Sequence, residues 1–221
     1  MKITILTLFP DMFVGPLTES IVKRAATKKL IDISIVNIRD FAQNTYKTVD
    51  GRPYGGGVGM ILRVDVVDRA LQSAGKGHVI LLDAGGTPYT QKAAQTLSTV
   101  DHLILISGHY EGVDDRVRAL VDEEISIGDY VLTGGEIPAM VIVDSVVRLI
   151  PGVLAKADAT VHESFTTRAL EYPQFTEPRE YHGVSVPSVL LSGNHAAIES
   201  WKKDEAGKRT DRVRPDLKAQ E

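Results

Sequence analysis

Cysteine is absent from this 221-residue sequence. Its absence excludes disulfide bonds, thiolate metal sites and cysteine nucleophiles, and it fits a reducing compartment. Long apolar runs are missing too, because the best candidate for a membrane span, 137–154, contains Asp144 and Arg148. The apolar N-terminus ends at Pro10 without the small-residue site of a signal peptide, so it is typical of a first β-strand. We therefore expect a cytoplasmic protein with no membrane partner.

A strong excess of one charge is also lacking. The net charge of -4 argues against a general polyanion-binding chain, so any nucleic-acid site must be a local basic patch. The sequence has no G-x-G-x-x-G after a strand, no P-loop, no H-E-x-x-H and no G-x-S-x-G. Apolar residues make up 43% of the chain, which is enough for a core in one domain, with or without a small appendage.

Apolar segments of strand type alternate with segments of helical spacing over the first 150 residues or so. We expect strands at 3–9, 33–38, 78–82 and 102–106 and a strand end at 125–127. We expect helices at 16–30, 64–74, 90–97 and 114–121, and one that begins near Pro138 and stops before Pro151. This alternation indicates an α/β fold whose parallel sheet is covered on both faces.

Glycine-bearing loops follow three of the expected strands, at 83–87, 108–112 and 127–135. Loops at the carboxyl ends of parallel strands can converge on one crevice. Gly134 and Gly135 also permit unusual backbone angles and leave no side chain to block a ligand. We therefore expect a small-molecule site here, although a tight structural connection explains the stretch 126–140 equally well.

Three charged residues stand in or near these loops. Arg148 lies four residues after Asp144 in an otherwise apolar helix, so it either forms an intrahelical ion pair or is a buried guanidinium with a function. Asp129 and Glu111 are acids in the glycine-bearing loops, where each can bind a ligand or cap a neighbouring turn.

Two other regions lack periodicity. The segment 39–60 contains Arg52, Tyr54 and a cluster of glycines, and a loop of this length is usually functional or disordered. After Pro151 the chain is small and polar at 155–163, where it carries His162 and Glu163.

The C-terminal part of the chain has another sequence pattern. A helix is expected at 189–201, after a proline-containing stretch without a clear pattern. The final segment 202–218 contains seven basic and four acidic residues. It is either a solvated helical appendage or a contact to a phosphate backbone.

Six ordered segments closely resemble the bacterial tRNA (guanine-N1)-methyltransferases, the TrmD family. They read LTLFPDMF, TVDGRPYGGGVGM, GHYEGVDDRV, SIGDYVLTGGEIPAM, RLIPGVL and VPSVLLSGNHAAI. The resemblance runs from about Ile5 to Leu217 and implies a SPOUT-type parallel sheet with a C-terminal trefoil knot, a rare exception to unthreaded chains. It further implies a methyltransferase domain at 1–155, a linker at 156–170, a small helical tRNA-binding domain at 171–221, and a homodimer.

Members of this family transfer a methyl group from S-adenosyl-L-methionine to N1 of the guanine immediately 3′ of the tRNA anticodon. By match, the cofactor site would be lined by Leu82, Asp83, Ala84, Gly85, Gly108, Glu111, Gly112, Ile127, Gly128, Asp129, Tyr130, Val131, Leu132, Gly134, Gly135 and Pro138. The segment that contacts tRNA would include Arg52, Tyr54, Gly55, Gly56, Gly57, Gly59 and Met60.

The resemblance also assigns two catalytic residues. N1 of guanine carries a proton, and its removal pushes negative charge onto O6, so a carboxylate can serve as the base while a guanidinium or Mg²⁺ holds the oxygen. The family's base is an aspartate followed by Ser-Phe, and Glu163 takes its place here beside His162, which is a rival base. The family's oxygen-holding arginine matches Arg148. No residue is predicted to be a metal ligand.

The sequence departs from the family at two further places. Residues 83–86 read DAGG where members often have SPQG, and Glu177 stands where an arginine is usual. Two alternatives stay open, the second because a glutamate replaces the aspartate base. The chain can be a SPOUT methyltransferase that acts on another RNA position, or an RNA-binding protein that keeps the fold without catalysis.

Overall fold

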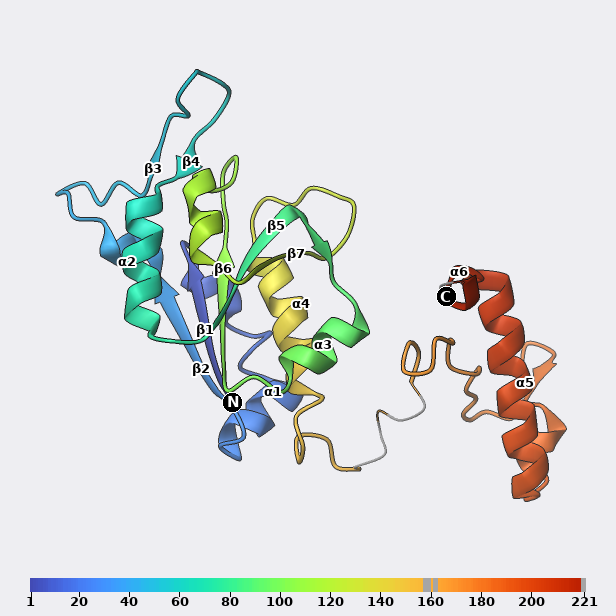
Figure 1. Ribbon diagram of the computed structural model, residues 1–221. Helices are drawn as coiled ribbons and strands as arrows, with labels where there is room; N and C mark the ends of the chain where they lie inside the picture. The colour runs from blue at the N-terminus through green and yellow to red at the C-terminus, as the bar shows by residue number, and fades with distance from the viewer. Residues whose placement is uncertain (157–159, 161–162, 220–221) are drawn as a thin grey trace. The chain divides into compact units, whose positions relative to one another are not determined.

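The computed structural model describes residues 1–156, 160 and 163–219. The chain divides into two compact units, Met1–Ala155 and Lys156–Glu221 (Figure 1). Among the described residues, no helix is long and apolar enough to cross a membrane.

The first unit is built on a five-stranded sheet in which every pair of neighbouring strands is parallel. The strand order is β2-β1-β6-β5-β7. The strands are β1 Lys2–Thr7, β2 Asp32–Asn37, β5 His78–Pro88, β6 His102–Ser107 and β7 Glu123–Ser126. The parallel sheet expected from the alternating pattern is therefore confirmed.

Helices cover both faces of this sheet (Figure 1). The α-helices are α1 Ser20–Thr27, α2 Val64–Ala74, α3 Gln91–Leu97 and α4 Glu136–Val147, and the 3₁₀ helices are η1 Pro10–Phe13, η2 Ile38–Phe41 and η3 Asp115–Leu120. Leu103 and Leu105 of β6 pack on the side of α1, α3 and α4, whereas Ile104 and Ile106 pack on the side of α2 and η3. Because side chains alternate along a strand, a fully apolar β6 fills both cores.

Three expectations for the first unit are wrong in detail. The segment 83–88 is not a loop but the second half of β5, whose register against β7 shifts between Leu82 and Thr87. The helix expected at 16–30 is only Ser20–Thr27, because Ser20 and Lys29 adopt positive φ angles of 53° and 57° that a continuous helix through 16–30 does not allow. The helix expected at 114–121 is the 3₁₀ helix η3.

Two short strands, β3 Asp50–Gly51 and β4 Ile61–Leu62, pair antiparallel and frame the segment 52–60. The unpatterned region 39–60 therefore contains η2 and β3. Leu62 is tied to the neighbouring loop, since its amide donates to the carbonyl oxygen of Gly112 at 2.9 Å.

The second unit contains a β8–β9 hairpin (Glu180–Tyr181 and Val184–Ser185), followed by the 3₁₀ helix η4 (Ser188–Leu191). The helices α5 His195–Val213 and α6 Asp216–Ala219 follow. The helix expected at 189–201 begins only at His195, where Asn194 caps it by accepting from the amide of Ala197 at 3.1 Å.

Candidate functional site

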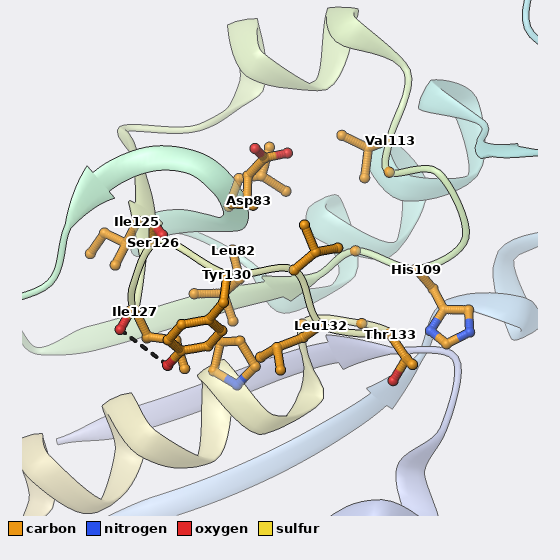
Figure 2. A pocket seen from close by; sticks show the side chains of 18 of the residues that line it. Leu82, Asp83, His109, Val113, Ile125, Ser126, Ile127, Tyr130, Leu132 and Thr133 are labelled. Atoms are coloured by element: carbon orange, nitrogen blue, oxygen red, sulfur yellow. Dashed lines mark hydrogen bonds between the residues drawn. The ribbon is translucent and has the colours of Figure 1, made fainter.

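A cavity of about 280 Å³ lies at the carboxyl ends of β6 and β7, beside the middle of β5 (Figure 2). Its walls come from the segments 81–84, 108–113, 125–128 and 130–135, and Pro138 of α4 completes it. Open parallel sheets bind small molecules at this edge. Two of the three glycine-bearing segments, 108–112 and 127–135, therefore converge on one crevice as expected, whereas 83–87 contributes only Asp83 and Ala84 and no glycine.

Most residues expected at the site line this cavity. They are Leu82, Asp83, Ala84, Gly108, Glu111, Gly112, Ile127, Gly128, Tyr130, Val131, Leu132, Gly134, Gly135 and Pro138. Gly85 and Asp129 do not line it. The amide of Gly85 donates to Oδ1 of Asp83 at 2.8 Å, within the bulged part of β5, and Asp129 is exposed.

Other lining residues were missed. They are Leu81, His109, Tyr110, Val113, Ile125, Ser126 and Thr133. Each lies within or no more than two residues from a segment that the glycine pattern indicates. Proximity to these segments, and not residue type, could therefore have identified them.

Two walls of the cavity are joined through their backbones. The amide of Gly135 donates to the carbonyl oxygen of Gly108 at 2.8 Å, and His109 forms an antiparallel bridge with Gly134. A Cβ atom on Gly135 would lie 2.7 Å from Cα of Ser107, and one on Gly134 would lie 2.6 Å from Nδ1 of His109. These glycines were expected to make room for a ligand, but they make room for the protein's own chain.

A buried carboxylate supports this junction. Glu136, the first residue of α4, is only 1% exposed and accepts a hydrogen bond from the Thr7 hydroxyl at 2.8 Å. Its Oε2 lies 3.9 Å from Nδ1 of His109, and the His109 ring packs against Phe9 with 4.6 Å between centroids. The positive end of the α4 dipole favours a negative charge at this position. Glu136 thus connects the end of β1, the loop after β6 and the start of α4.

The outer lip of the cavity is apolar and exposed. The Tyr130 hydroxyl donates to the carbonyl oxygen of Ile127 at 3.3 Å within the same loop (Figure 2). Val131 is 88% exposed. Asp83 and Glu111 add carboxylates to the lining. The cavity can therefore hold a ligand that has both an apolar ring and a positively charged group.

The segment expected to contact tRNA joins one wall of the cavity. The amide of Glu111 donates to the carbonyl oxygen of Met60 at 3.0 Å, and a Cβ atom on Gly59 would lie 2.5 Å from Cγ of Glu111. Gly55, Gly56 and Gly57 lie further out in the same exposed segment, at positive φ.

A polar groove adjoins the cavity wall, and Arg52, Tyr54, Asp114 and Arg116 are among its lining residues. The hydrogen bonds from the Arg116 guanidinium lower the pKa of the Asp114 carboxyl to about 2. Asp114, which also caps η3, therefore stays ionised at ordinary pH.

The two expected catalytic residues belong to different units. Arg148 is half-buried at the C-terminal end of α4 in the unit Met1–Ala155, and Glu163 belongs to the unit Lys156–Glu221. His162, the rival base, lies outside the described residues. Among the residues that are described, no group of three or more His, Asp or Glu could hold a metal ion.

Comparisons with known proteins agree with one another. The family model described as tRNA (Guanine-1)-methyltransferase TrmD matches residues 1–220. A relative from Dictyoglomus turgidum is 53% identical over 98% of this chain and 89% of its own length. A relative from Geobacillus kaustophilus is 52% identical over 98% of this chain and 91% of its own length. Both are named tRNA (guanine-N(1)-)-methyltransferase.

The glycine junction predicts unequal effects of two alanine substitutions. Gly135→Ala should destabilise the fold by about 1–3 kcal/mol, because the added methyl group collides with backbone atoms. Gly108→Ala should change stability by less than about 0.5 kcal/mol, because its Cβ would meet no atom closer than 3.7 Å. Urea denaturation followed by circular dichroism measures both, and equal losses would contradict the junction.

Proposed function

The chain belongs to the tRNA (guanine-1)-methyltransferase family TrmD, and we propose that its glycine-walled cavity holds S-adenosyl-L-methionine during the reaction. The protein is a methyltransferase that uses this cofactor to methylate N1 of the guanine immediately 3′ of the tRNA anticodon. The match over residues 1–220 carries this conclusion. The names of the relatives favour base methylation over ribose methylation and catalysis over RNA binding alone.

The cavity suits this cofactor. The cofactor has a flat adenine ring and two positively charged groups, and it supplies an electrophilic methyl group on sulfur. The apolar lip around Tyr130 and Leu132 offers a surface for the ring, and the carboxylate of Glu111 favours the positive charges. The carboxylate of Asp83 already pairs with the Arg118 guanidinium at 3.4 Å. Backbone amides and carbonyls of 127–135 can form hydrogen bonds with the polar edge of the adenine ring.

Proton removal is assigned to the second unit. We infer that the Glu163 carboxylate accepts the N1 proton of guanine while the Arg148 guanidinium stabilises the negative charge that develops on O6. A Mg²⁺ ion is a second candidate for holding this oxygen. Because the two residues lie in different units, catalysis depends on how the units are assembled on tRNA.

A homodimer is proposed as the working assembly. Its support is an apolar surface on α4 and the loop before it, where Val131 is 88%, Ile137 47% and Val141 41% exposed. Large apolar side chains exposed on one helix and the loop before it are typical of a surface that a partner covers.

A trefoil knot is also proposed, and its support is the path of the chain after β7. After β7 at the edge of the sheet, the chain returns past the end of β6, and α4 packs against α1, α3, β1 and β6. A trefoil knot at residues 126–147 needs this return and, in addition, passage of the chain through a loop formed by the neighbouring segments.

tRNA is proposed to contact the segment 52–60 and the second unit. In that unit Lys208, Arg209 and Arg212 of α5 line one groove together with Pro173, Gln174 and Glu205. Three guanidinium or ammonium groups along one groove are suited to phosphate. Since tRNA is found in the cytoplasm, we propose that the enzyme works there.

The reaction is tested by its product. The protein should transfer tritium-labelled methyl groups from S-adenosyl-L-methionine to a tRNA with guanine 3′ of the anticodon, and nucleoside analysis should yield N1-methylguanosine. A ribose-methylated product would point to another position of action. Tight tRNA binding without any product would mean that the fold has lost catalysis.

Substitutions of Glu163 and of His162 should have unequal effects on the rate of methyl transfer. Glu163→Gln keeps the shape but removes the basicity, so single-turnover transfer should fall by about 10²-fold or more. Glu163→Asp should keep activity, and His162→Ala should matter much less. If His162→Ala abolishes transfer while Glu163→Gln does not, the imidazole is the base. The rate would then fall as the pH drops through about 6.5.

Mixing two inactive variants tests the dimer. If each site combines Arg148 of one subunit with Glu163 of the other, a mixture of Arg148→Ala and Glu163→Gln chains forms hybrid dimers with one intact site. Random exchange should then restore about a quarter of the wild-type sites. A mixture as inactive as its components would show that both residues act from the same chain, and a monomer in light scattering would contradict the dimer itself.

A further inference from the structure

The segment that carries Glu163 has a defined local fold. The amide of Phe165 donates to the carbonyl oxygen of Ala169 at 2.8 Å, and the amide of Thr166 donates to the carbonyl oxygen of Glu163 at 3.3 Å. Its ends are closed by the Ser164 hydroxyl, which accepts from the amide of Glu171 at 3.0 Å. The backbone at Glu163 is therefore coupled to the residues that end this loop, 163–171.

A buried hydroxyl on α5 holds the end of the loop. Thr210 is fully buried, and it is the buried residue of a helix whose other side chains are exposed or half-buried. Its Oγ1 accepts from the amide of Leu170 at 2.9 Å and donates to the carbonyl oxygen of Ala206 at 2.7 Å. The Thr210 hydroxyl thus accepts one hydrogen bond and donates another, and the two partners together fix its orientation.

Neighbours on α5 add to this attachment. The guanidinium of Arg209 donates to the carbonyl oxygen of Glu171 at 3.3 Å. Arg214 follows α5, and its Cζ lies 5.6 Å from the centroid of the Phe165 ring, within the range of a cation–π contact. Arg209 also lines the basic groove proposed to meet phosphate. One helix therefore contacts both the loop 163–171 and the surface offered to RNA.

We propose that Thr210 is a positioning residue for methyl transfer, which sets the place of the Glu163 carboxylate through Leu170. This inference rests on the proposed role of Glu163 as the base. The second unit, which is proposed to bind the RNA, would then also use α5 to fix the loop 163–171 that carries the base Glu163. Small displacements of a catalytic group can lower a rate by about 10²-fold. A hydrogen bond that fixes the loop of Glu163 should therefore affect the rate of methyl transfer.

Two substitutions separate the hydrogen bond from packing. Thr210→Val keeps the side-chain volume and branching but cannot accept from Leu170, whereas Thr210→Ser keeps the hydroxyl. Thr210 is buried and lies outside the unit that holds the cofactor cavity. Neither variant should therefore change the Kd for S-adenosyl-L-methionine by more than about twofold.

The test measures single-turnover methyl transfer at saturating cofactor and tRNA, together with hydrogen exchange of the Leu170 amide. Thr210→Val should slow transfer by about tenfold or more and speed exchange at Leu170, while Thr210→Ser stays close to wild type. In a Glu163→Gln background, Thr210→Val should cause little further loss, because residues that act as one unit are not additive.

Each contrary result has a distinct meaning. Unchanged transfer in Thr210→Val, an equal loss in Thr210→Ser, or a full additional loss in the Glu163→Gln background would overturn the positioning role. If Glu163→Gln itself transfers at the wild-type rate, the base assignment fails, and the positioning role fails with it. If Glu163→Gln is impaired and Thr210→Val is not, only the positioning role fails.

Discussion

The close approach of the 127–135 loop to the end of β6 is the constraint on which the site depends. It requires Gly134 and Gly135, because a Cβ atom at either position would collide with His109 or Ser107. The hydrogen bond from Gly135 to Gly108 then joins two walls of the cavity. The same contact sets the start of α4, and therefore the burial of Glu136. Cavity, helix and buried carboxylate follow from one backbone junction.

The proposed chemistry is divided between the two units. The first offers an apolar lip, backbone groups and carboxylates suited to a cationic cofactor, and it also carries Arg148. The second carries Glu163 on a loop that α5 holds through Thr210. The proposed cofactor site and the proposed base thus lie in separate compact units, so assembly on the tRNA can control when they act together.

Sequence patterns predicted the sheet and the converging loops well. Buried parallel strands such as 102–106 are continuous apolar runs, and glycines mark loops, so both signals are local. The bulge in 83–88 was missed because it arises from pairing with β7, more than 30 residues away. Glu136 was missed because its partner Thr7 is 129 residues distant. The knot, the dimer and the roles of Arg148 and Glu163 came only from family resemblance.

Binding of S-adenosyl-L-methionine to Gly108→Ala, measured by isothermal titration calorimetry, tests the cofactor site most directly. The added methyl group would lie 3.7 Å from the Leu82 carbonyl oxygen and from Val113, both in the lining of the cavity. It should weaken binding by about tenfold or more, the scale of one misplaced methyl group. Gly51→Ala, a matched control with no atom within 4 Å of its Cβ, should bind normally. Unchanged affinity in Gly108→Ala would remove the cofactor from this cavity.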